Sequence, residues 1–433
     1  MNMERRPKVL IITYYYPPVN VTGALRPLSF AKYLPEYGYD VKILTTARHG
    51  ACHGENSSNI LRGFEPYGYF IAPLRNYIMR DVPASKRSTS RVISSQSVLS
   101  RIQNRLLIPD QAVTWIPFAT MLAAYHAKRI PFDILLSTSP PESPHLVGLL
   151  LKKMFDIPWV ADFRDGWLFE PLKPPECYQG VQGSLLKYLE GSVVKNADRI
   201  ISVTPPIAQD FSERYPSCAD KVCVITNGYD NKEIASVKRN RIQDDVFRII
   251  YTGALSLSRS ERSATPFFKA IADLVNDNRG GIAQHLQVNF IGDFLSIEKS
   301  YVHNMRLDQW VTFSNSVPRA QAIQSQKDSD VLLLITEPNR KGVATAKLFD
   351  YIGVRRPILA LAKGDTAGEI VDSLKIGYVV DRENKEEIML AIMALYDRWC
   401  SGNLNLDGDP PNQYGRCFQS GMLAKIFDDL LKK

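Results

Sequence analysis

The sequence predicts an α/β protein built from two doubly wound, Rossmann-like halves. Short runs rich in Val, Ile and Leu alternate with helical stretches along most of the chain, and such runs are typical of parallel strands buried on both faces. The alternation is interrupted by one polar, charged stretch at residues 229–245 and then begins again. A repeated strand and helix alternation of this kind indicates two parallel sheets, each covered by helices.

The N-terminal half, residues 1–228, begins with a βαβ unit. Residues 8–13 are apolar and β-prone, residues 23–37 have a helical pattern between two glycines, and residues 41–44 form the next apolar run. The same rhythm predicts the other elements of this half: strands at 134–137, 159–161, 199–203 and 222–225, and helices at 144–155, 185–195 and 207–214.

The second half, residues 246–412, follows the stretch 229–245, which we expect to be an interdomain linker because it has no apolar periodicity. Its predicted strands and helices are as follows: strands at 247–251, 288–291, 311–313, 331–335, 358–361 and 378–380, and helices at 266–275, 319–326, 344–352, 367–374 and 385–399. In the terminal segment 413–433, an amphipathic helix at 422–431 needs a surface to cover, and we expect it to return to the N-terminal half.

Residues 75–108 break the alternation. They form a basic insertion with interleaved apolar residues and a single acid, Asp81; its bases are Arg75, Arg80, Lys86, Arg87, Arg91, Arg101 and Arg105. Such a segment fits association with an anionic membrane. It equally fits an insertion that packs its apolar side on its own domain.

Composition places the chain among globular proteins. Of its 433 residues 45% are hydrophobic and 23% charged, which excludes disordered, collagenous and coiled-coil classes. The net charge of +8 favours anionic partners. The six cysteines are scattered without a CxxC pair, so we expect a reducing, cytoplasmic location and no structural zinc. No apolar run reaches the roughly 18 residues of a spanning helix.

Candidate functional residues of the first half lie in loops that follow strands. Gly23 opens the first helix, although the loop lacks the GxGxxG fingerprint of dinucleotide binding. Asp162, Arg164 and Asp165 follow a buried strand, where they form either an ion-pair knot that holds the loop or the charged floor of a cleft. His145 on its own is more typical of a packing residue at a helix start than of a catalyst.

In the second half, Gly253 follows a strand and Arg259 lies shortly after it, which is a reasonable clamp for a diphosphate. The helix that starts at residues 342–346 offers free N–H groups to an anion. On that helix, Asp350 either accepts sugar hydroxyls or pairs with Lys347. Asp407-Gly-Asp409 matches a DxD metal signature but does not follow a strand, so we expect no metal there.

Several motifs occur together in this chain. They are Tyr15-Tyr-Pro-Pro with Gly23 and Arg26-Pro27, Ser137-Thr-Ser-Pro-Pro, Ile157 to Trp167, Ala197-Asp198, Val224 to Asp230, Tyr251-Thr-Gly253, and Lys347-Leu-Phe-Asp-Tyr351 through Pro357. With these motifs the sequence resembles, from about Lys8 to about Tyr378, the GT-B-fold glycosyltransferases of family 4. The resemblance is to the bacterial subgroup that acts in exopolysaccharide, capsule and O-antigen assembly.

The resemblance implies metal-independent, retaining transfer of a hexose from a nucleotide-diphosphate sugar, which is a co-substrate and not a cofactor. The donor would bind the C-terminal half and a glycan, lipid-linked or small-molecule acceptor the N-terminal half. Donor-binding residues would be Gly23, Gly253, Arg259, Val317, Gly342, Val343, Ala344, Thr345, Lys347 and Asp350. Catalytic residues would be Asp162, Arg164, Asp165 and Arg259, and the acceptor side would include Tyr15, Arg26, Ser139 and His145.

Two departures from the family pattern concern the site. The paired glutamates of the family fall on Gly342 and Asp350, and the histidine after the fourth strand falls on Arg164. Two other readings stay open: a nucleotide-sugar 2-epimerase of the same fold, and a non-catalytic basic binding protein. The Gly and Arg loops argue against the second, as does the lack of a concentrated aromatic and basic stacking surface, and we expect no nucleic-acid partner.

Overall fold

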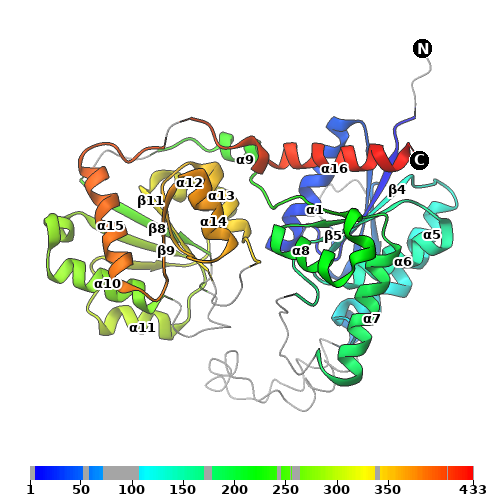
Figure 1. Cartoon of the computed structure of the whole chain (residues 1–433), viewed down its shortest axis with the longest axis horizontal. Coiled ribbons are helices and arrows are strands. Elements are labelled where there is room, and N and C mark those ends of the chain that lie inside the picture. Colours follow the sequence, from blue (N-terminus) through cyan, green and yellow to red (C-terminus); the bar gives the residue numbers. More distant parts are fainter. Residues whose placement is uncertain are drawn as a thin grey trace. The chain divides into compact units, whose positions relative to one another are not determined.

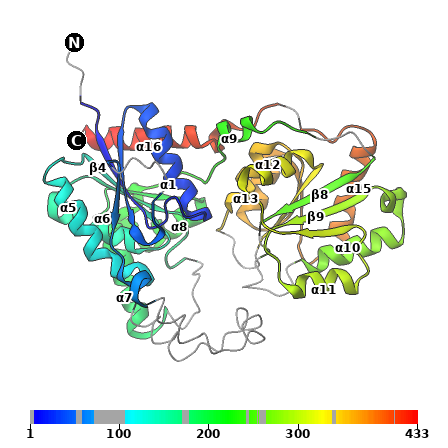
Figure 2. The ribbon, with the colours of Figure 1, turned by 180° about the vertical axis from the view of Figure 1, so that it is seen from behind.

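The computed structural model describes residues 5–51, 58–71, 107–169, 178–240, 245–253, 255, 264–336, 342–406 and 408–432. The chain divides into two compact units (Figures 1 and 2): unit 1 comprises Met1–Asn227 and Arg416–Lys433, and unit 2 comprises Gly228–Gly415. Each unit contains one parallel sheet. The predicted α/β class with two Rossmann-like halves is confirmed.

Unit 1 has a seven-stranded sheet in the order β3-β2-β1-β4-β5-β6-β7. The strands are β1 (Lys8–Ile12), β2 (Asp40–Thr46), β3 (Ile60–Gly63), β4 (Ile134–Ser139), β5 (Trp159–Phe163), β6 (Arg199–Ser202) and β7 (Val222–Val224). The sequence analysis missed β3, which is a short strand at the sheet edge.

Strand periodicity explains how the two faces of this sheet are covered. In β1, Val9 and Ile11 face one core, and Leu10 and Ile12 face the other, because successive side chains point to opposite faces. The first core includes side chains of α1 (Thr22–Tyr33) and α16 (Arg416–Leu431). The second includes side chains of four helices: α5 (Ile116–Ala127), α6 (Ser143–Phe155), α7 (Gly180–Asn196) and α8 (Pro205–Arg214).

Helix α16 joins the end of the chain to unit 1 (Figure 1). Its Leu423 and Phe427 are completely buried in the core that also contains α1. The Tyr39 hydroxyl donates to Asp428 Oδ1 at 2.5 Å, and Gln419 Nε2 donates to the Asn227 carbonyl at 2.8 Å. The helix begins at Arg416, six residues earlier than the amphipathic pattern indicates.

Unit 2 has a six-stranded sheet in the order β10-β9-β8-β11-β12-β13. The strands are β8 (Phe247–Thr252), β9 (Leu286–Ile291), β10 (Val311–Ser314), β11 (Val331–Ile335), β12 (Ile358–Leu361) and β13 (Gly377–Val380). The helices are α9 (Asn231–Ser236), α10 (Thr265–Asn276), α11 (Ser296–Asn304), α12 (Arg319–Asp328), α13 (Ala346–Val354), α14 (Thr366–Leu374) and α15 (Lys385–Cys400).

The stretch 229–245, expected to be an interdomain linker, is partly structured and belongs to unit 2. It contains α9, whose N-cap Asp230 accepts a hydrogen bond from the Glu233 backbone at 3.1 Å. Tyr229 and Ile234 are buried in the core of unit 2. A helix this short has too few apolar positions to reveal a period, so its sequence looks like a linker.

The basic insertion at 75–108 lies outside the described residues except for Leu107 and Ile108. Among the helices of the described residues, none is both long enough and apolar enough to cross a membrane.

Candidate functional site

Each sheet reverses its strand order at one point, and ligands of open α/β sheets bind beyond the carboxyl ends of the strands at such a point. In unit 1 the reversal lies between β1 and β4, and in unit 2 it lies between β8 and β11. The loops that follow these four strands, together with the helices into which they lead, contain most of the candidate residues.

In unit 1, Arg164 ties three loops together. Its Nε donates to the Ser139 carbonyl at 2.7 Å, and its terminal nitrogens donate to the carbonyls of Gly23 and Pro140. A Cβ added at Gly23 would lie 2.9 Å from Arg164 Nη1, so Gly23 leaves room for the guanidinium. Burial lowers the pKa of Arg164 from its ordinary value. Arg164 therefore fixes the mutual positions of the loops after β1, β4 and β5.

Asp162 forms a buried ion pair with Arg26. Arg26 Nη2 donates to Asp162 Oδ1 at 2.7 Å and Thr138 Oγ1 donates to Oδ2 at 2.7 Å. Arg26 also donates to the carbonyls of Ile225 and Thr226. Both side chains are almost fully buried. This pair holds α1, β5 and the end of β7 in place, whereas the half-buried Asp165 lies past the strand end.

His145 is a buried structural residue in the first turn of α6, which follows β4. Its Nδ1 is 2.7 Å from Ser137 Oγ and its Nε2 is 2.8 Å from Ser139 Oγ, and its ring lies 4.3 Å from that of Phe163. Complete burial lowers the pKa of His145 to about 3, so the imidazole is neutral at pH 7. The ordinary packing role weighed for His145 in the sequence is the one that this geometry favours.

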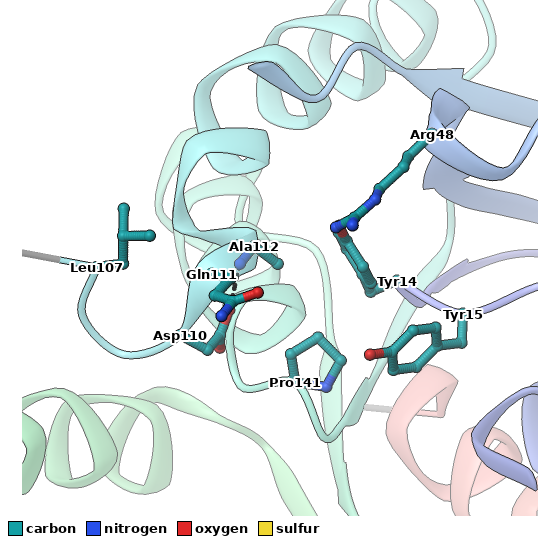
Figure 3. Close-up of a pocket in the computed structure, with 8 residues that line it drawn as sticks. All are labelled: Tyr14, Tyr15, Arg48, Leu107, Asp110, Gln111, Ala112 and Pro141. Carbon is teal, nitrogen blue, oxygen red and sulfur yellow. Dashed lines mark hydrogen bonds between the residues drawn. The ribbon is translucent and has the colours of Figure 1, made fainter. Parts of the chain in front are cut away.

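Unit 1 also has a pocket of about 250 Å³ (Figure 3). The lining residues follow β1, β2 and β4 or precede α5: Tyr14, Tyr15, Arg48, Leu107, Asp110, Gln111, Ala112 and Pro141. Figure 3 shows Tyr15 and Arg48 on one side of the pocket and Asp110 with Gln111 on the other. The pocket thus adjoins the point where the strand order reverses.

The charges of this pocket are unequally compensated. Asp110 accepts hydrogen bonds from the backbone N–H groups of Ala112, Glu142 and Ser143 at 2.7 to 2.9 Å. Arg48 Nη1 donates to the Tyr14 hydroxyl at 3.3 Å and, among the described residues, forms no ion pair with a carboxylate. Burial raises the pKa of Tyr14 to about 12, so the phenol keeps its proton. The pocket therefore offers a positive guanidinium beside two phenol rings.

In unit 2, Gly253 and Lys347 meet at the reversal point. Gly253 has φ of +98°, and a Cβ added there would lie 3.6 Å from Lys347 Nζ. Lys347 Nζ lies 3.5 Å from the centroid of the Tyr251 ring. Burial lowers the pKa of Lys347 to about 7, and no charged group among the described residues offsets this. An anion bound beside Lys347 would supply the opposite charge that the described residues do not provide.

The start of α13 adds free backbone donors close to Lys347. Thr345 is its N-cap and has no side-chain hydrogen bond to the first turn. Before the helix, Gly342 and Ala344 are buried, Val343 is half-buried and Thr345 is exposed. The first N–H groups of a helix bind anions, since they have no partner within the helix.

Asp350 pairs with an arginine and not with Lys347, the partner weighed in the sequence. Arg319 Nη1 and Nη2 donate to the two oxygens of Asp350 at 2.9 and 2.8 Å, while its Nε donates to Glu233 at 2.7 Å. These carboxylates raise the pKa of Arg319. Val317 is half-buried and lies just before α12.

Two residues singled out in the sequence, Arg259 and Asp407, lie outside the described residues. In the described part of the chain, no group of three or more His, Cys, Asp or Glu could hold a metal ion. The sequence did not point to two residues of the candidate site, Arg48 in the pocket of unit 1 and Arg319 beside Asp350. A search for charged residues just after strands would have found Arg48, but the pairing of Arg319 with Asp350 leaves no sequence signal.

Comparisons with known proteins bear directly on this site. A model of glycosyl transferase 4-like domains matches residues 22–228. Unit 1 therefore contains a segment that is similar to a glycosyl transferase 4-like domain. This segment contains Gly23, Arg26 and the Asp162 to Asp165 loop, so the resemblance to family 4 glycosyltransferases is confirmed. No curated protein matches the sequence significantly.

Solved structures confirm the GT-B fold. A glycosyltransferase from Rickettsia africae is similar with TM-score 0.64 and 13% identity, over 99% of this chain and 100% of that one. Sucrose-phosphate synthase from Thermosynechococcus elongatus has TM-score 0.65 and 13% identity, over 99% and 100%. UDP-GlcNAc 2-epimerase from Methanocaldococcus jannaschii has TM-score 0.52 and 11% identity, over 98% and 99%. At these identities the likeness concerns the fold alone.

Proposed function

We propose that the protein is a retaining, metal-independent glycosyltransferase that moves a hexose from a nucleotide-diphosphate sugar to a hydroxyl of a glycan, lipid-linked or small-molecule acceptor. The matched glycosyl transferase 4-like domain supports sugar transfer. The motifs around Asp162 and Lys347 support a role in bacterial polysaccharide assembly. The four described cysteines are free, which fits a reducing, cytoplasmic location.

One observation carries the proposal: at the reversal point of unit 2, Lys347 Nζ lies 3.6 Å from where a Cβ at Gly253 would be, and Lys347 has no carboxylate partner among the described residues. A cation that lacks a counter-ion is costly to bury. A diphosphate would supply the missing charge, and the first N–H groups of α13 would bind its other oxygens. Gly253 would let the phosphates come close to the backbone.

The nucleoside would bind along α12 and α13. Asp350 would accept hydrogen bonds from ribose hydroxyls with the lone pairs that Arg319 leaves available, since each carboxylate oxygen accepts more than one bond. The backbone near Val317 would contact the base. Arg259 would join Lys347 in stabilising the charge that develops on the departing diphosphate.

The acceptor would bind the pocket of unit 1, where the lining residues Tyr15 and Arg48 would contact the hydroxyl groups of the acceptor. Asp165 is a better candidate than Asp162 to hold the attacking hydroxyl, because Asp162 is buried and bound to Arg26 and Thr138. The bond from the anomeric carbon to the diphosphate oxygen breaks, and that oxygen keeps the electron pair. The acceptor oxygen bonds to the same face of the sugar, and its proton leaves with the diphosphate. Arg164 would position these loops.

Calorimetry with nucleoside diphosphates and their sugars tests the donor site. We expect one class of these compounds to bind, and Lys347→Met to weaken it about tenfold or more, because a charge-assisted hydrogen bond is lost. Lys299→Met changes an exposed lysine of α11 and is the matched control. Equal affinities of wild type and Lys347→Met would contradict the assignment. The configuration of the new linkage, read by NMR, tests retention.

The similar epimerase structure favours one alternative, a nucleotide-sugar 2-epimerase. An epimerase converts the nucleotide sugar without an acceptor, whereas a transferase releases nucleoside diphosphate only when an acceptor is present. Incubation with the nucleotide sugar alone separates the two. Peripheral association with an anionic membrane is also part of this proposal, on the ground of the basic insertion at 75–108.

A further inference from the structure

Tyr351 places a hydroxyl group inside an apolar core of unit 2. The side chain lies on α13 and is completely buried, in the same hydrophobic cluster as Leu348, Ile352 and Ile250. A phenol in such surroundings costs free energy unless its oxygen is hydrogen-bonded. Burial raises the pKa of Tyr351 to about 12, so the hydroxyl keeps its proton at neutral pH. The partner of this hydroxyl therefore explains why a tyrosine, and not an apolar residue, occupies the position.

The partner is the backbone at the end of β8. The Thr252 N–H donates to the Tyr351 hydroxyl at 3.2 Å. The pairing of β8 with β11 stops at Ile250, although both strands continue. Because successive N–H groups of a strand point to opposite sides, and that of Gly253 donates to β9, the Thr252 N–H points toward β11. The phenol thus takes the place of a strand partner where β8 and β11 separate.

A second helix holds the side chain of Thr252. Gln326 of α12 donates from Nε2 to Thr252 Oγ1 at 2.8 Å, and this Oγ1 lies 3.4 Å from the Tyr351 hydroxyl. All three side chains are buried. Helices α12 and α13 lie side by side over the sheet of unit 2 (Figures 1 and 2). Two helices are therefore hydrogen-bonded to the residue that directly precedes Gly253.

Tyr351 lies one turn after Lys347 on the same face of α13, since the two residues are four positions apart. Lys347 Nζ lies 3.6 Å from where a Cβ at Gly253 would be. Two successive turns of one helix face thus meet two successive residues at the end of one strand. Loss of the bond between Tyr351 and Thr252 would change the distance from Lys347 to the Gly253 backbone.

We propose that Tyr351 is a positioning residue of the donor site, whose hydroxyl sets the spacing between Gly253 and Lys347. This inference rests on the proposed binding of a diphosphate by these two residues. A site binds tightly only when its donors are held in the right geometry before the ligand arrives, and a misplacement of about 1 Å is costly. Tyr351 acts through the Thr252 backbone and does not itself contact the ligand.

Calorimetry with a nucleotide sugar tests the proposal. Tyr351→Phe removes one oxygen and leaves the Thr252 N–H without its acceptor, so we expect affinity to fall by about tenfold or more. The matched control is Tyr229→Phe. Tyr229 is also buried in this core, and its hydroxyl donates to the Pro411 carbonyl at 3.2 Å. The control should lower Tm by a similar amount and keep the affinity of the wild type.

A double-mutant cycle separates positioning from a general loosening of unit 2. In a Lys347→Met background, Tyr351→Phe should weaken binding clearly less than it does in the wild type, because the amine that the phenol positions is gone. A merely structural role would weaken binding by the same factor in both backgrounds. Equal factors, or equal weakening by Tyr229→Phe, would overturn the proposal.

Hydrogen exchange without ligand, followed by mass spectrometry of the peptide that ends β8, reports on the bond itself. Tyr351→Phe should speed exchange of the Thr252 amide, whereas Lys347→Met should not. Unchanged exchange or unchanged donor affinity in Tyr351→Phe would overturn the positioning role and leave Lys347 in the donor site. If Lys347→Met binds the nucleotide sugar as the wild type does, or the wild type does not bind it, the donor site is wrong and this inference fails with it.

Discussion

At the scale of single residues, the ion pair between Arg26 and Asp162 is a structural support of the candidate site. Arg26→Ala would leave the Asp162 carboxylate buried without its cation, which costs about 3–5 kcal/mol of unfolding free energy. Arg5→Ala removes an exposed pair with Asp133 and should cost less than about 1 kcal/mol. Urea unfolding monitored by tryptophan fluorescence measures both. A similar, small loss of unfolding free energy in the two variants would mean that Arg26 does not hold α1 and β5 in place.

Lys347 makes donor binding dependent on pH. Its pKa is about 7 in the folded chain and ordinary, about 10.4, in the unfolded chain. Between these values only the unfolded chain binds the proton, so the contribution of Lys347 to stability rises with pH from about 7 to about 10 and is constant below that window. A bound diphosphate favours the protonated amine.

We therefore expect donor affinity to be highest below pH 7 and to fall by up to about tenfold for each pH unit above it, as the fraction of protonated Lys347 falls. Calorimetry with a nucleotide sugar from pH 6 to 8.5 measures this trend. A nucleotide sugar is the right probe, because it lacks the terminal phosphate ionisation near pH 6. Lys347→Met should abolish the trend, and a flat profile in the wild type would contradict it.

At the scale of elements, Gly292 at the end of β9 sets the shape of the loop after β8. It has φ of +156°, and a Cβ added there would lie 2.5 Å from the Gly253 carbonyl oxygen. Gly292→Ala should displace Gly253 and weaken binding of the nucleotide sugar by about tenfold or more, beyond a backbone cost of roughly 1–3 kcal/mol. Calorimetry and Tm measure the two effects.

Gly364→Ala is the matched control for this prediction. Gly364 also has a positive φ of +81°, but no atom lies within 4 Å of an added Cβ. The control therefore has backbone strain without the clash. Equal donor affinities of the two variants would show that contact with Gly253 does not shape the donor site.

Elements were predicted well where the period of apolar residues was long enough to read. The strands at 331–335 and 358–361 agree with β11 and β12 at both ends, because apolar residues, mostly Val, Ile and Leu, fill every position of these strands buried on both faces. Helix α5 was not predicted, because its own residues are small or apolar on every face of the helix and therefore form no amphipathic stripe.

The sequence predicted which loops contribute to the candidate site, but it did not predict which charged side chains form ion pairs there. Gly253 and Lys347 follow strands or open a helix, and such positions can be read from a sequence. Arg319 and Asp350 pair across two helices, and the Arg26 side chain reaches Asp162 in β5. These contacts depend on how helices pack on the sheet, which single-residue patterns do not encode.

At the scale of the whole molecule, the path of the chain makes the two units unequal. Unit 2 is one continuous stretch, Gly228–Gly415, with two hydrophobic cores of its own. Unit 1 is completed only when Arg416–Lys433 returns to it. Without α16, the core around Phe30, Tyr39 and Ile43 would lose the cover of Leu423 and Phe427 and expose apolar side chains to water.

We therefore expect residues 228–415 produced alone to unfold cooperatively and to bind nucleoside diphosphates in calorimetry. Residues 1–227 alone should be far less stable than the same fragment joined to residues 416–433 by a short flexible linker, because burial of several large apolar side chains stabilises by about 1.5–3 kcal/mol each. Urea unfolding of the two unit 1 fragments measures the difference. Equal stability of both would contradict a role for α16 as part of unit 1, and it would locate the function of the terminal helix outside folding.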